Sequence, residues 1–457
     1  MGSRIKRRLR PLIVGLAVAL VPLTVLPAAG ARTDAGARTD ASQVTLRFWV
    51  MNNGPEPVRD TERILAPFER QTGIDVRVEL VGWDVQYQRI TNAALSGEAP
   101  DVTQAGTTQV PFFAMLQGFE NLAGRVGQIG GARAYAPGVW ATSQVAGSRG
   151  VWAVPWFTEA RTIYYRKDVF RRAGINPRTA FRDWAAFRRT LIRLKRVRSV
   201  NGRPIAPFGQ PGKTAWDLVH HVMPFVWGAG GSELSRSRRQ SGITSPQAVR
   251  GVKFFADLIP AGVFLTSSLE RNAPQVEEQF KGGRIATWIG GPWVLASARR
   301  ADDEAWAPEA RRNIGVAQMP VGPTGKFYTF VGGSNLMMFK RSRHKAEAWQ
   351  LMRFLSREDT QLAYARLQGM FPARLAPQRR QGRLNANQAA FYRAITHGRT
   401  YAPIPQWGPI ENVYKTRFGN ILDMAAGQGR RPYNRSSLTA ELQAAAREAN
   451  ALLAQGG

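Results

Sequence analysis

The sequence FKGGRIATWIGGPW at residues 280–293 combines a helix end, a short strand and a tight turn. The pair Gly282-Gly283 predicts the end of a helix, because glycine readily adopts the left-handed conformation that terminates helices. Residues 285–289 are apolar and predict a buried strand. The Gly-Gly-Pro turn that follows leaves backbone N–H groups with little side-chain cover, so we expect Gly291 and Trp293 to contact a ligand. A buried tryptophan after a tight turn is the alternative.

Residues 43–102 alternate between strand and helix patterns. Apolar and polar residues alternate over 44–50 and 74–80, whereas residues 60–71 and 84–96 have the apolar spacing of helices. With a third strand starting near residue 100, this βαβαβ order predicts parallel strands, whose ligands bind beyond the carboxyl ends. The loops at that edge are candidates for ligand binding, and the alternative is that their residues only form turns. Their amide, hydroxyl and glycine residues, which suit hydrogen bonding to a polar ligand, are Asn52, Asn53, Gly54, Thr107 and Thr108.

Further motifs follow one another along the chain. Trp152-Ala-Val-Pro-Trp156 precedes the segment Ile163-Tyr-Tyr-Arg-Lys-Asp-Val-Phe170, and a glycine turn opens the apolar segment 330–339. The segments Gly369-Met-Phe-Pro-Ala-Arg374 and Ile404-Pro-Gln-Trp407 come later. In their order and spacing, these motifs and residues 280–293 resemble extracellular solute-binding protein family 1 of bacterial ABC transporters, which includes the maltose-binding proteins. The resemblance extends over about residues 43–455, with Arg166 where the family often has asparagine.

The resemblance implies an α/β, two-lobed periplasmic-binding-protein fold of type II, with parallel-sheet lobes joined by a multi-strand hinge. It implies an N-terminal lobe of residues 43–153 plus 322–375 and a C-terminal lobe of residues 154–321 plus 376–457. Closure of such lobes buries a small ligand between them.

The resemblance also implies roles for single residues. In the family, the tryptophan equivalent to Trp293 commonly stacks on a sugar ring, an arginine at Arg374 often points at the ligand, and an aromatic segment at Trp407 closes over it. Together with the loop residues, the predicted ligand-binding residues are Asn52, Asn53, Gly54, Trp83, Thr107, Thr108, Trp156, Trp216, Asp217, Gly291, Trp293, Gly332, Gly333, Ser334, Arg374, Trp407 and Glu411.

The expected function is to capture a carbohydrate, most simply an oligosaccharide, and deliver it to the membrane permease subunits of an ABC importer. The 13 tryptophans and 10 tyrosines favour a neutral sugar, whose C–H faces stack on aromatic rings. The high arginine content leaves glycerol phosphates or acidic sugars as an alternative, through bidentate pairing.

Two other classes of protein are alternatives to a solute-binding protein. A secreted carbohydrate-active enzyme needs two carboxylates across the scissile bond, which Asp101, Asp217 and Glu411 could supply. A basic envelope-binding protein with a degenerate cleft is the other. No Ser-His-Asp, zinc or phosphate-loop motif occurs, and His220 and His221 are adjacent on one predicted helix, where they cannot chelate a metal together. We therefore expect a monomer that is not an enzyme and has no catalytic residue, metal or cofactor.

The N-terminal sequence predicts that the protein is exported. A basic segment at residues 4–10, an apolar run at 12–26 and the sequence Ala29-Gly-Ala31 predict a cleaved signal peptide of residues 1–31. A single membrane anchor is the alternative, but two prolines interrupt the apolar run. The sequence of small and polar residues at 31–36 is nearly repeated at 37–42, and residues 32–42 are expected to be a flexible leader. Because the chain has no cysteine, we expect neither disulfides nor lipid attachment, and a soluble protein in the periplasm or at the outer face of the cell envelope.

The formal net charge of the chain is +31, and removal of the five basic residues of the signal peptide leaves 31 − 5 = +26. Only 10 of the 63 basic residues are lysines, and the arginines run through the whole chain. No zinc-finger spacing or RNA-binding aromatic motif accompanies them, so a nucleic-acid partner is not expected. A general preference for arginine and retention at an anionic envelope are the two interpretations of the charge.

Overall fold

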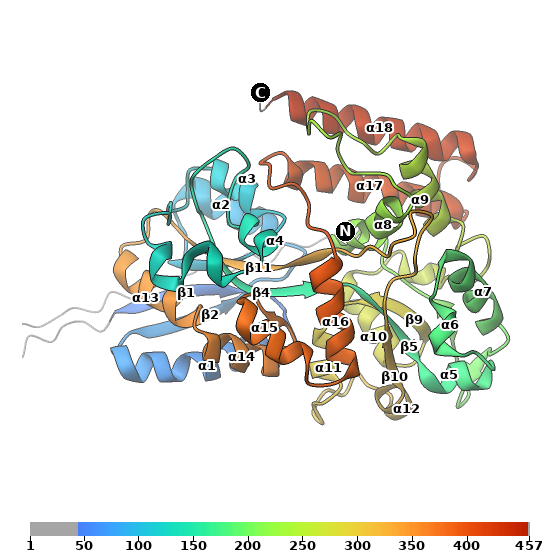
Figure 1. Cartoon of the computed structure of the whole chain (residues 1–457), viewed down its shortest axis with the longest axis horizontal. Coiled ribbons are helices and arrows are strands. Elements are labelled where there is room, and N and C mark those ends of the chain that lie inside the picture. Colours follow the sequence, from blue (N-terminus) through green and yellow to red (C-terminus); the bar gives the residue numbers. More distant parts are fainter. Residues whose placement is uncertain (1–43, 456–457) are drawn as a thin grey trace, which may run out of the picture. The chain divides into compact units, whose positions relative to one another are not determined.

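The computed structural model describes residues 44–455, which contain two large β-sheets with helices packed on their faces, and a small two-stranded sheet (Figure 1). The predicted signal peptide and leader lie outside the described residues. None of the helices in this part of the chain combines the length and hydrophobicity that a membrane span needs.

The first sheet has the strand order β12-β4-β11-β3-β1-β2. β1 pairs in parallel with β2 and β3, which confirms the predicted βαβαβ unit, with helices α1 (Pro57–Thr72) and α2 (Gln86–Ser96) between the strands. β11 pairs antiparallel with both β3 and β4, so the sheet combines the predicted parallel strands with antiparallel ones. The strands are β1 (Thr45–Val50), β2 (Asp75–Leu80), β3 (Val102–Gly106), β4 (Val154–Ala160), β11 (Val331–Met338) and β12 (Phe371–Pro372).

The second sheet has the order β10-β5-β9-β8 and is also mixed, because only β8 and β9 are parallel. Its central strand β9 (Ile285–Gly290) is buried at every position, as the apolar run 285–289 predicts. Helix α10 (Ala273–Lys281) ends where predicted, with Gly283 in the left-handed conformation at φ +78°. The other strands are β5 (Thr162–Arg166), β8 (Ala206–Phe208) and β10 (Ile314–Ala317).

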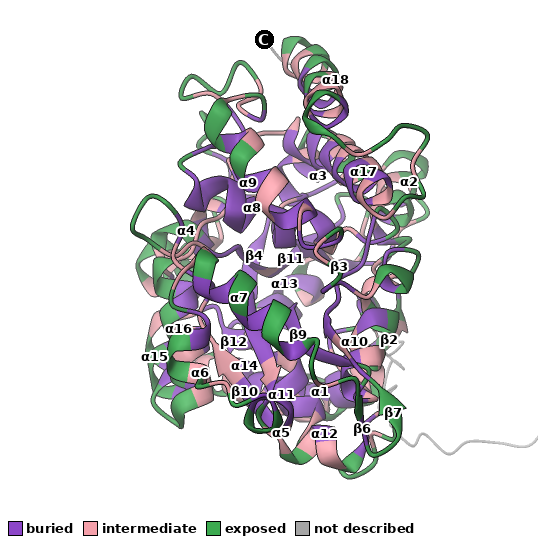
Figure 2. Cartoon of the chain, turned by 90° about the vertical axis from the view of Figure 1, so that its right-hand side faces the viewer, coloured by how far each residue is buried: buried purple, intermediate pink, exposed green. Residues whose placement is uncertain are grey.

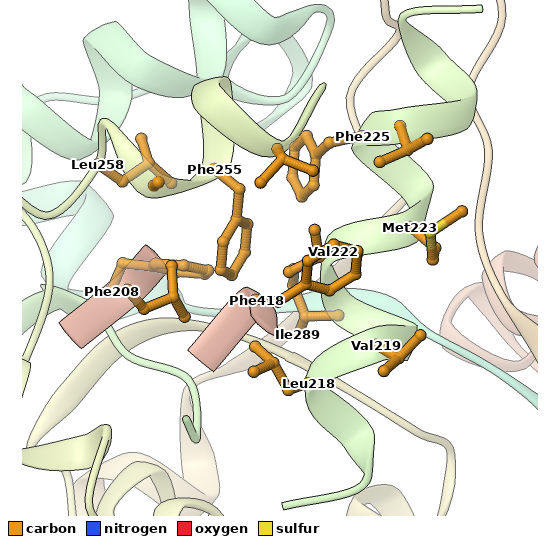
Figure 3. Close-up of a cluster of buried hydrophobic side chains, with 14 of the residues drawn as sticks. Phe208, Leu218, Val219, Val222, Met223, Phe225, Phe255, Leu258, Ile289 and Phe418 are labelled. Atoms are coloured by element: carbon orange, nitrogen blue, oxygen red, sulfur yellow. The ribbon is translucent and has the colours of Figure 1, made fainter. Parts of the chain in front are cut away.

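The second sheet and its helices enclose a large hydrophobic core (Figure 3). Phe208 and Ile289 from the strands meet Leu218, Val222 and Phe225 of α8 (Asp217–Gly228). The helices α9 (Pro246–Ala256), α17 (Trp407–Ala425) and α18 (Arg435–Ala454) complete it. A separate core fills the space between the first sheet and its helices α1, α13 (Lys345–Leu355) and α14 (Glu358–Gln368). Buried residues line both sheets in Figure 2.

The remaining helices and the small hairpin cover the sheets and their connections. They are α3 (Val110–Met115), η1 (Val126–Ile129), η2 (Gly131–Ala134), α4 (Pro137–Ala141), α5 (Lys167–Arg172), α6 (Pro177–Ala180), α7 (Trp184–Leu194), β6 (Ser199–Val200), β7 (Arg203–Pro204), η3 (Thr266–Ser268), α11 (Trp293–Ser297), α12 (Pro308–Arg312), α15 (Leu375–Gly382) and α16 (Ala386–His397).

The chain passes between the two sheets along segments that lie side by side. β4 of the first sheet continues through Arg161 into β5 of the second. Phe330 precedes β11, and its carbonyl accepts a hydrogen bond from the Arg161 N–H at 3.2 Å. Arg399 lies next to this segment, since its carbonyl accepts from the Val331 N–H at 2.8 Å. The lobe boundaries given above stay a prediction, and these segments are the connections that a hinge would use.

Candidate ligand-binding site

A buried carboxyl group, Glu411 of α17, faces the loop that follows β3. The Thr108 hydroxyl donates a 2.9 Å hydrogen bond to Glu411 Oε2. The other oxygen, Oε1, lies 3.6 Å from His220 Nδ1 and forms no hydrogen bond. The indole N–H groups of Trp216 and Trp407 are close enough to this carboxyl to lower its pKa, but neither completes a hydrogen bond to it or to another group of the described residues. Thr108, Trp216, His220, Trp407 and Glu411 are called the Glu411 site below.

The electrostatics of the Glu411 site favour neutral groups. Burial raises the pKa of the Glu411 carboxyl to about 8, although the Thr108 hydroxyl and the Trp216 indole act to lower it. At neutral pH this carboxyl therefore carries its proton and can donate as well as accept. Burial also holds the pKa of His220 well below its usual range, and lowers that of His221 to about 3. His220 is therefore neutral, and its contact with Glu411 is not an ion pair.

Aromatic rings from both sheets' helices surround these polar groups. Trp216 stacks on Tyr87 of α2, with ring centroids 5.5 Å apart and the planes at 27°. Trp407 stacks on Tyr401 at 4.2 Å, also at 27°. Lys415 Nζ lies 5.4 Å from the Trp216 ring centroid. Aromatic faces beside hydrogen-bonding groups suit a ligand that is apolar on one side and polar on its edges.

A second cluster surrounds Arg161 at the crossing between the sheets. This buried guanidinium donates to Glu159 and, at 2.9 Å, to Asp217 Oδ1. Its Cζ lies 4.8 Å from the Trp293 ring centroid, and the Trp293 indole donates to Glu277 at 2.6 Å. Burial raises the pKa of Glu159 to about 7, whereas Arg161 overcomes the effect of burial at Asp217 and holds its pKa below the usual value. The cation at this position is thus already paired with two carboxylates.

The loop after β1 joins an internal network instead. Asn53 Nδ2 donates to Gln104 Oε1 at 2.9 Å and to the Tyr364 hydroxyl at 2.7 Å. Gln104 Nε2 donates to Asn53 Oδ1 at 3.0 Å and to the Ser334 hydroxyl at 2.9 Å. Asn53, Gln104, Ser334 and Tyr364 are buried and are called the Gln104 network below. Asn52 is exposed, and its carbonyl accepts from the Trp83 indole at 3.0 Å.

The structure brings some of the predicted residues together at the Glu411 site. Thr107, Thr108 and Trp407 line a small cavity of about 10 Å³, with Tyr401 and Thr142 among its other walls. Such a volume holds about one water molecule. Trp216 and Glu411 adjoin it through the contacts above, and Asp217 follows Trp216 at the start of α8.

Other predicted residues lie elsewhere. Trp156 is fully buried in the first core, with its ring centroid 4.4 Å from that of Tyr364. Arg374 lines a separate groove of about 780 Å³ bordered by α1, η1 and α13–α15, where its Nη1 donates to the Ile129 carbonyl at 2.8 Å. A Cβ at Gly54 would come within 2.1 Å of Gln368 Oε1, so this glycine lies against α14.

The glycine turns are tighter than the sequence indicates. Gly291 is buried and its carbonyl accepts from the Tyr164 hydroxyl at 2.7 Å, so the expectation of an uncovered backbone there is wrong. Gly333 has φ +132°, and a Cβ on it would lie 2.2 Å from the Phe157 carbonyl oxygen in β4. A side chain at Gly333 would therefore meet the neighbouring strand first. A Cβ at Gly332 would meet the Phe330 ring at 2.4 Å.

Sequence reasoning missed Glu159, Arg161, His220, Tyr87 and Gln104. A signal for two of them exists, since Glu159 and Arg161 are ionisable residues in the middle of the largely apolar strand sequence of residues 154–165. Buried charges are rare in such strands unless they are paired. Within residues 44–455, no three His, Asp or Glu side chains are grouped closely enough to hold a metal ion.

Two mixed sheets joined by several crossing segments, with polar and aromatic residues from both collected near the crossings, define a solute-binding protein of two-lobed type. The sequence model of the bacterial extracellular solute-binding proteins matches residues 55–362, and the chain belongs to this family. This confirms the family and fold implied by the sequence motifs.

Relatives and solved structures agree with this assignment. The diacetylchitobiose-binding protein DasA of Streptomyces coelicolor is 26% identical over 415 residues, which cover 88% of this chain and 91% of DasA. A solute-binding protein of Thermotoga lettingae, solved with α-D-tagatose, has a TM-score of 0.77 at 24% identity and covers 90% of this chain and 100% of its own. UgpB of Mycobacterium tuberculosis, solved with glycerophosphocholine, has a TM-score of 0.72 at 19% identity and covers 90% and 98%.

Proposed function

We propose that the protein is the substrate-binding component of an ABC importer, and that it captures a carbohydrate at the Glu411 site and delivers it to membrane permease subunits. The observation that carries the proposal is the set of buried, unpaired polar atoms on Glu411, Trp216 and Trp407. Such atoms are costly unless a partner satisfies them. Sugar hydroxyls both donate and accept, and the C–H faces of a sugar ring fit the adjacent aromatic rings.

The proposal includes the lobes of residues 43–153 plus 322–375 and 154–321 plus 376–457. The hydrogen bond between Thr108 and Glu411 then joins the two lobes, and a sugar entering the site would compete for both groups. Relative motion of the lobes would be absorbed at Arg161, Phe330 and Arg399, where the chain crosses. The predicted contacts of Asn52, Trp83 and Trp293 belong to the same proposal.

The charges near the site favour a neutral ligand over a phosphate or an acidic sugar. Arg161 is already paired with Glu159 and Asp217, and the protonated Glu411 adds no charge of either sign. Lys415, half-buried against Trp216, is the cation closest in sequence to Glu411 on α17. An anionic ligand would have to compete with those carboxylates for the Arg161 guanidinium. An uncharged sugar does not have to compete with these carboxylates for Arg161.

We propose binding without catalysis. Asp101, one of the carboxylates that a hydrolase could use, lies at the start of β3, where it accepts hydrogen bonds from the Arg47 N–H and the Ser342 hydroxyl at 2.9 and 2.5 Å. That position is at the opposite end of the strand from Thr107. Asp217 is paired with Arg161, which holds it ionised. Glu411 thus has no second carboxylate free to act with it across a glycosidic bond.

A thermal-shift screen of the purified protein tests the function. We expect a neutral oligosaccharide, for which diacetylchitobiose and maltose are the first probes, to raise the melting temperature. At a hundred times the dissociation constant the stabilisation is about 2.7 kcal/mol. Glucuronic acid and glycerophosphocholine are expected to have little effect. A shift with glycerophosphocholine alone would contradict the carbohydrate assignment, and release of monosaccharide from the tightest ligand would contradict binding without catalysis.

Export is the remaining part of the proposal. We expect the exported protein to begin at Arg32, as a monomer that carries no lipid anchor. N-terminal sequencing of protein recovered outside the cytoplasm tests this. A sequence beginning at Met1, or protein that is released from membranes only by detergent, would contradict it.

A further inference from the structure

One side of the second sheet's helices carries a dense group of cations. Residues 167–203, which form α5, α6, α7 and the β6–β7 hairpin, contain twelve exposed lysine or arginine side chains and only two carboxylates. We call these exposed cations the α5–α7 face. Figure 2 views the molecule from this side, with exposed residues along α6 and α7.

The two carboxylates do not neutralise this face. Asp168 is held by the buried guanidinium of Arg166 at 2.6 Å. Asp183 accepts from the Ala186 N–H at 2.7 Å as the cap of α7 and pairs with Arg182 at 3.0 Å. Arg182 is the one cation of the face that forms an ion pair with any carboxylate of residues 44–455. The other eleven leave a net positive charge that points to solvent.

Helix α7 orients part of this charge. Phe187, Leu191 and Leu194 are buried, so the opposite side of the helix faces outward. That side presents Arg188 and Arg189, and between the cations it exposes Ile192, whose surface is 40% accessible. An apolar side chain surrounded by arginines matches a bilayer interface, where phosphate groups lie next to acyl chains. A soluble polyanion offers the phosphates but no apolar layer.

We propose that the α5–α7 face binds the anionic phospholipid headgroups of a bilayer and holds the protein at the membrane surface. Each lysine or arginine near such a surface strengthens binding about fivefold. Arginine also pairs with phosphate oxygens through two parallel hydrogen bonds. This attraction acts within about one Debye length, so it weakens steeply with salt.

The test is co-sedimentation of the mature protein with vesicles of phosphatidylcholine that contain one quarter phosphatidylglycerol. The salt concentration is about 0.1 M, at which the Debye length is about 10 Å. The face variant replaces Arg172, Arg188, Arg189 and Arg196 with glutamine. None of these side chains donates a hydrogen bond or forms an ion pair within the described residues, so the fold should persist. We expect its partition coefficient to fall at least about thirtyfold, and vesicles of phosphatidylcholine alone to bind neither protein.

A matched control removes the same charge elsewhere. The variant R353Q/R366Q/R379Q/R383Q changes exposed arginines on α13–α15 and directly after α15, and these helices lie on the other side of the molecule in Figure 1. Its partition coefficient should stay within about twofold of the wild type. Equal losses in both variants would overturn the proposal, because net charge alone would then explain binding. Failure of the wild-type protein to bind the vesicles would also overturn the proposal, and so would binding to an isolated anionic wall polymer but not to vesicles.

If the quadruple face variant fails to fold, the double variant R188Q/R196Q replaces it, and R379Q/R383Q is its control.

Discussion

The Gln104 network and the Glu411 site both include residues of β3 or of the loop after it, but they differ in how many of their buried polar atoms form hydrogen bonds. Gln104 makes four hydrogen bonds, to the Met51 N–H, to Asn53 twice and to Ser334, all at 2.9–3.0 Å. In the Glu411 site, one carboxyl oxygen and two indole N–H groups have no partner. A buried network with every member paired stabilises one arrangement, whereas an incompletely paired cluster gains from a bound partner. The comparison therefore assigns a structural role to the Gln104 network and supports the ligand-binding role proposed for the Glu411 site, and substitutions can test both.

The largest effect is expected from Gly333→Val, on the strand of the Gln104 network. The substitution places a β-branched side chain at φ +132° and against the Phe157 carbonyl, so we expect a loss of about 3–5 kcal/mol or no folded protein. Urea unfolding measures this. If the variant kept its stability and lost only ligand-induced stabilisation, Gly333 would belong with the binding residues.

Gln104→Leu should have the next largest effect. It leaves the Met51 N–H, the Asn53 amide and the Ser334 hydroxyl with fewer partners, and the expected cost is about 2–5 kcal/mol in the free energy of unfolding. The matched control is Gln88→Leu, on the exposed side of α2, with an expected change within about 0.5 kcal/mol. Similar losses in the two variants would mean that the network contributes nothing specific.

Glu411→Gln tests the other side of the comparison through pH. The folded protein holds the Glu411 proton up to a pKa of about 8, above the ordinary value of 4.5, so it binds more protons than the unfolded chain between these values. Glu411 therefore makes the free energy of unfolding fall as pH rises from 5 to 8, while the lowered pKa values of His220 and His221 make it rise with pH in both proteins. We expect this fall to be smaller in the variant by at least about 1 kcal/mol. The raised pKa of Glu159 contributes in the same direction in both proteins, so their difference isolates Glu411. Parallel pH profiles would contradict a buried, protonated Glu411.

The smallest effect on stability is expected from Thr108→Val. This shape-matched change removes one hydrogen bond to Glu411 and should cost about 1 kcal/mol or less without ligand. Ligand-induced stabilisation should fall by more than that, because both the hydroxyl and the orientation of the carboxyl are lost. Isothermal calorimetry with the best sugar from the screen measures the change in affinity. An unchanged affinity would place the sugar away from Thr108.

The sequence was enough to predict the secondary structure around β1–β3 and β9, and the family. It also pointed to Thr108, Trp407 and Glu411, which the structure brings together. The Gln104 network could not be predicted, because the partners of Gln104 are 51 and 230 positions away along the chain. Trp156 shows a different limit. Every residue of β4 is buried, so the strand sequence has no alternation to indicate which side chains face a ligand and which face the core.

The strand order of the first sheet has a consequence for how the protein folds. β11 lies between β3 and β4, and β12 lies at the edge beyond β4. β3 and β4 therefore have no shared ladder until residues 331–338 arrive, which follow β4 by about 170 positions, and the edge strand comes later still. Pairings between such distant segments form slowly. A chain still emerging from the ribosome cannot complete this sheet until residues 371–372, about four fifths of the way along the chain, have been synthesised, which would give the export machinery of the proposal time to engage an unfolded chain.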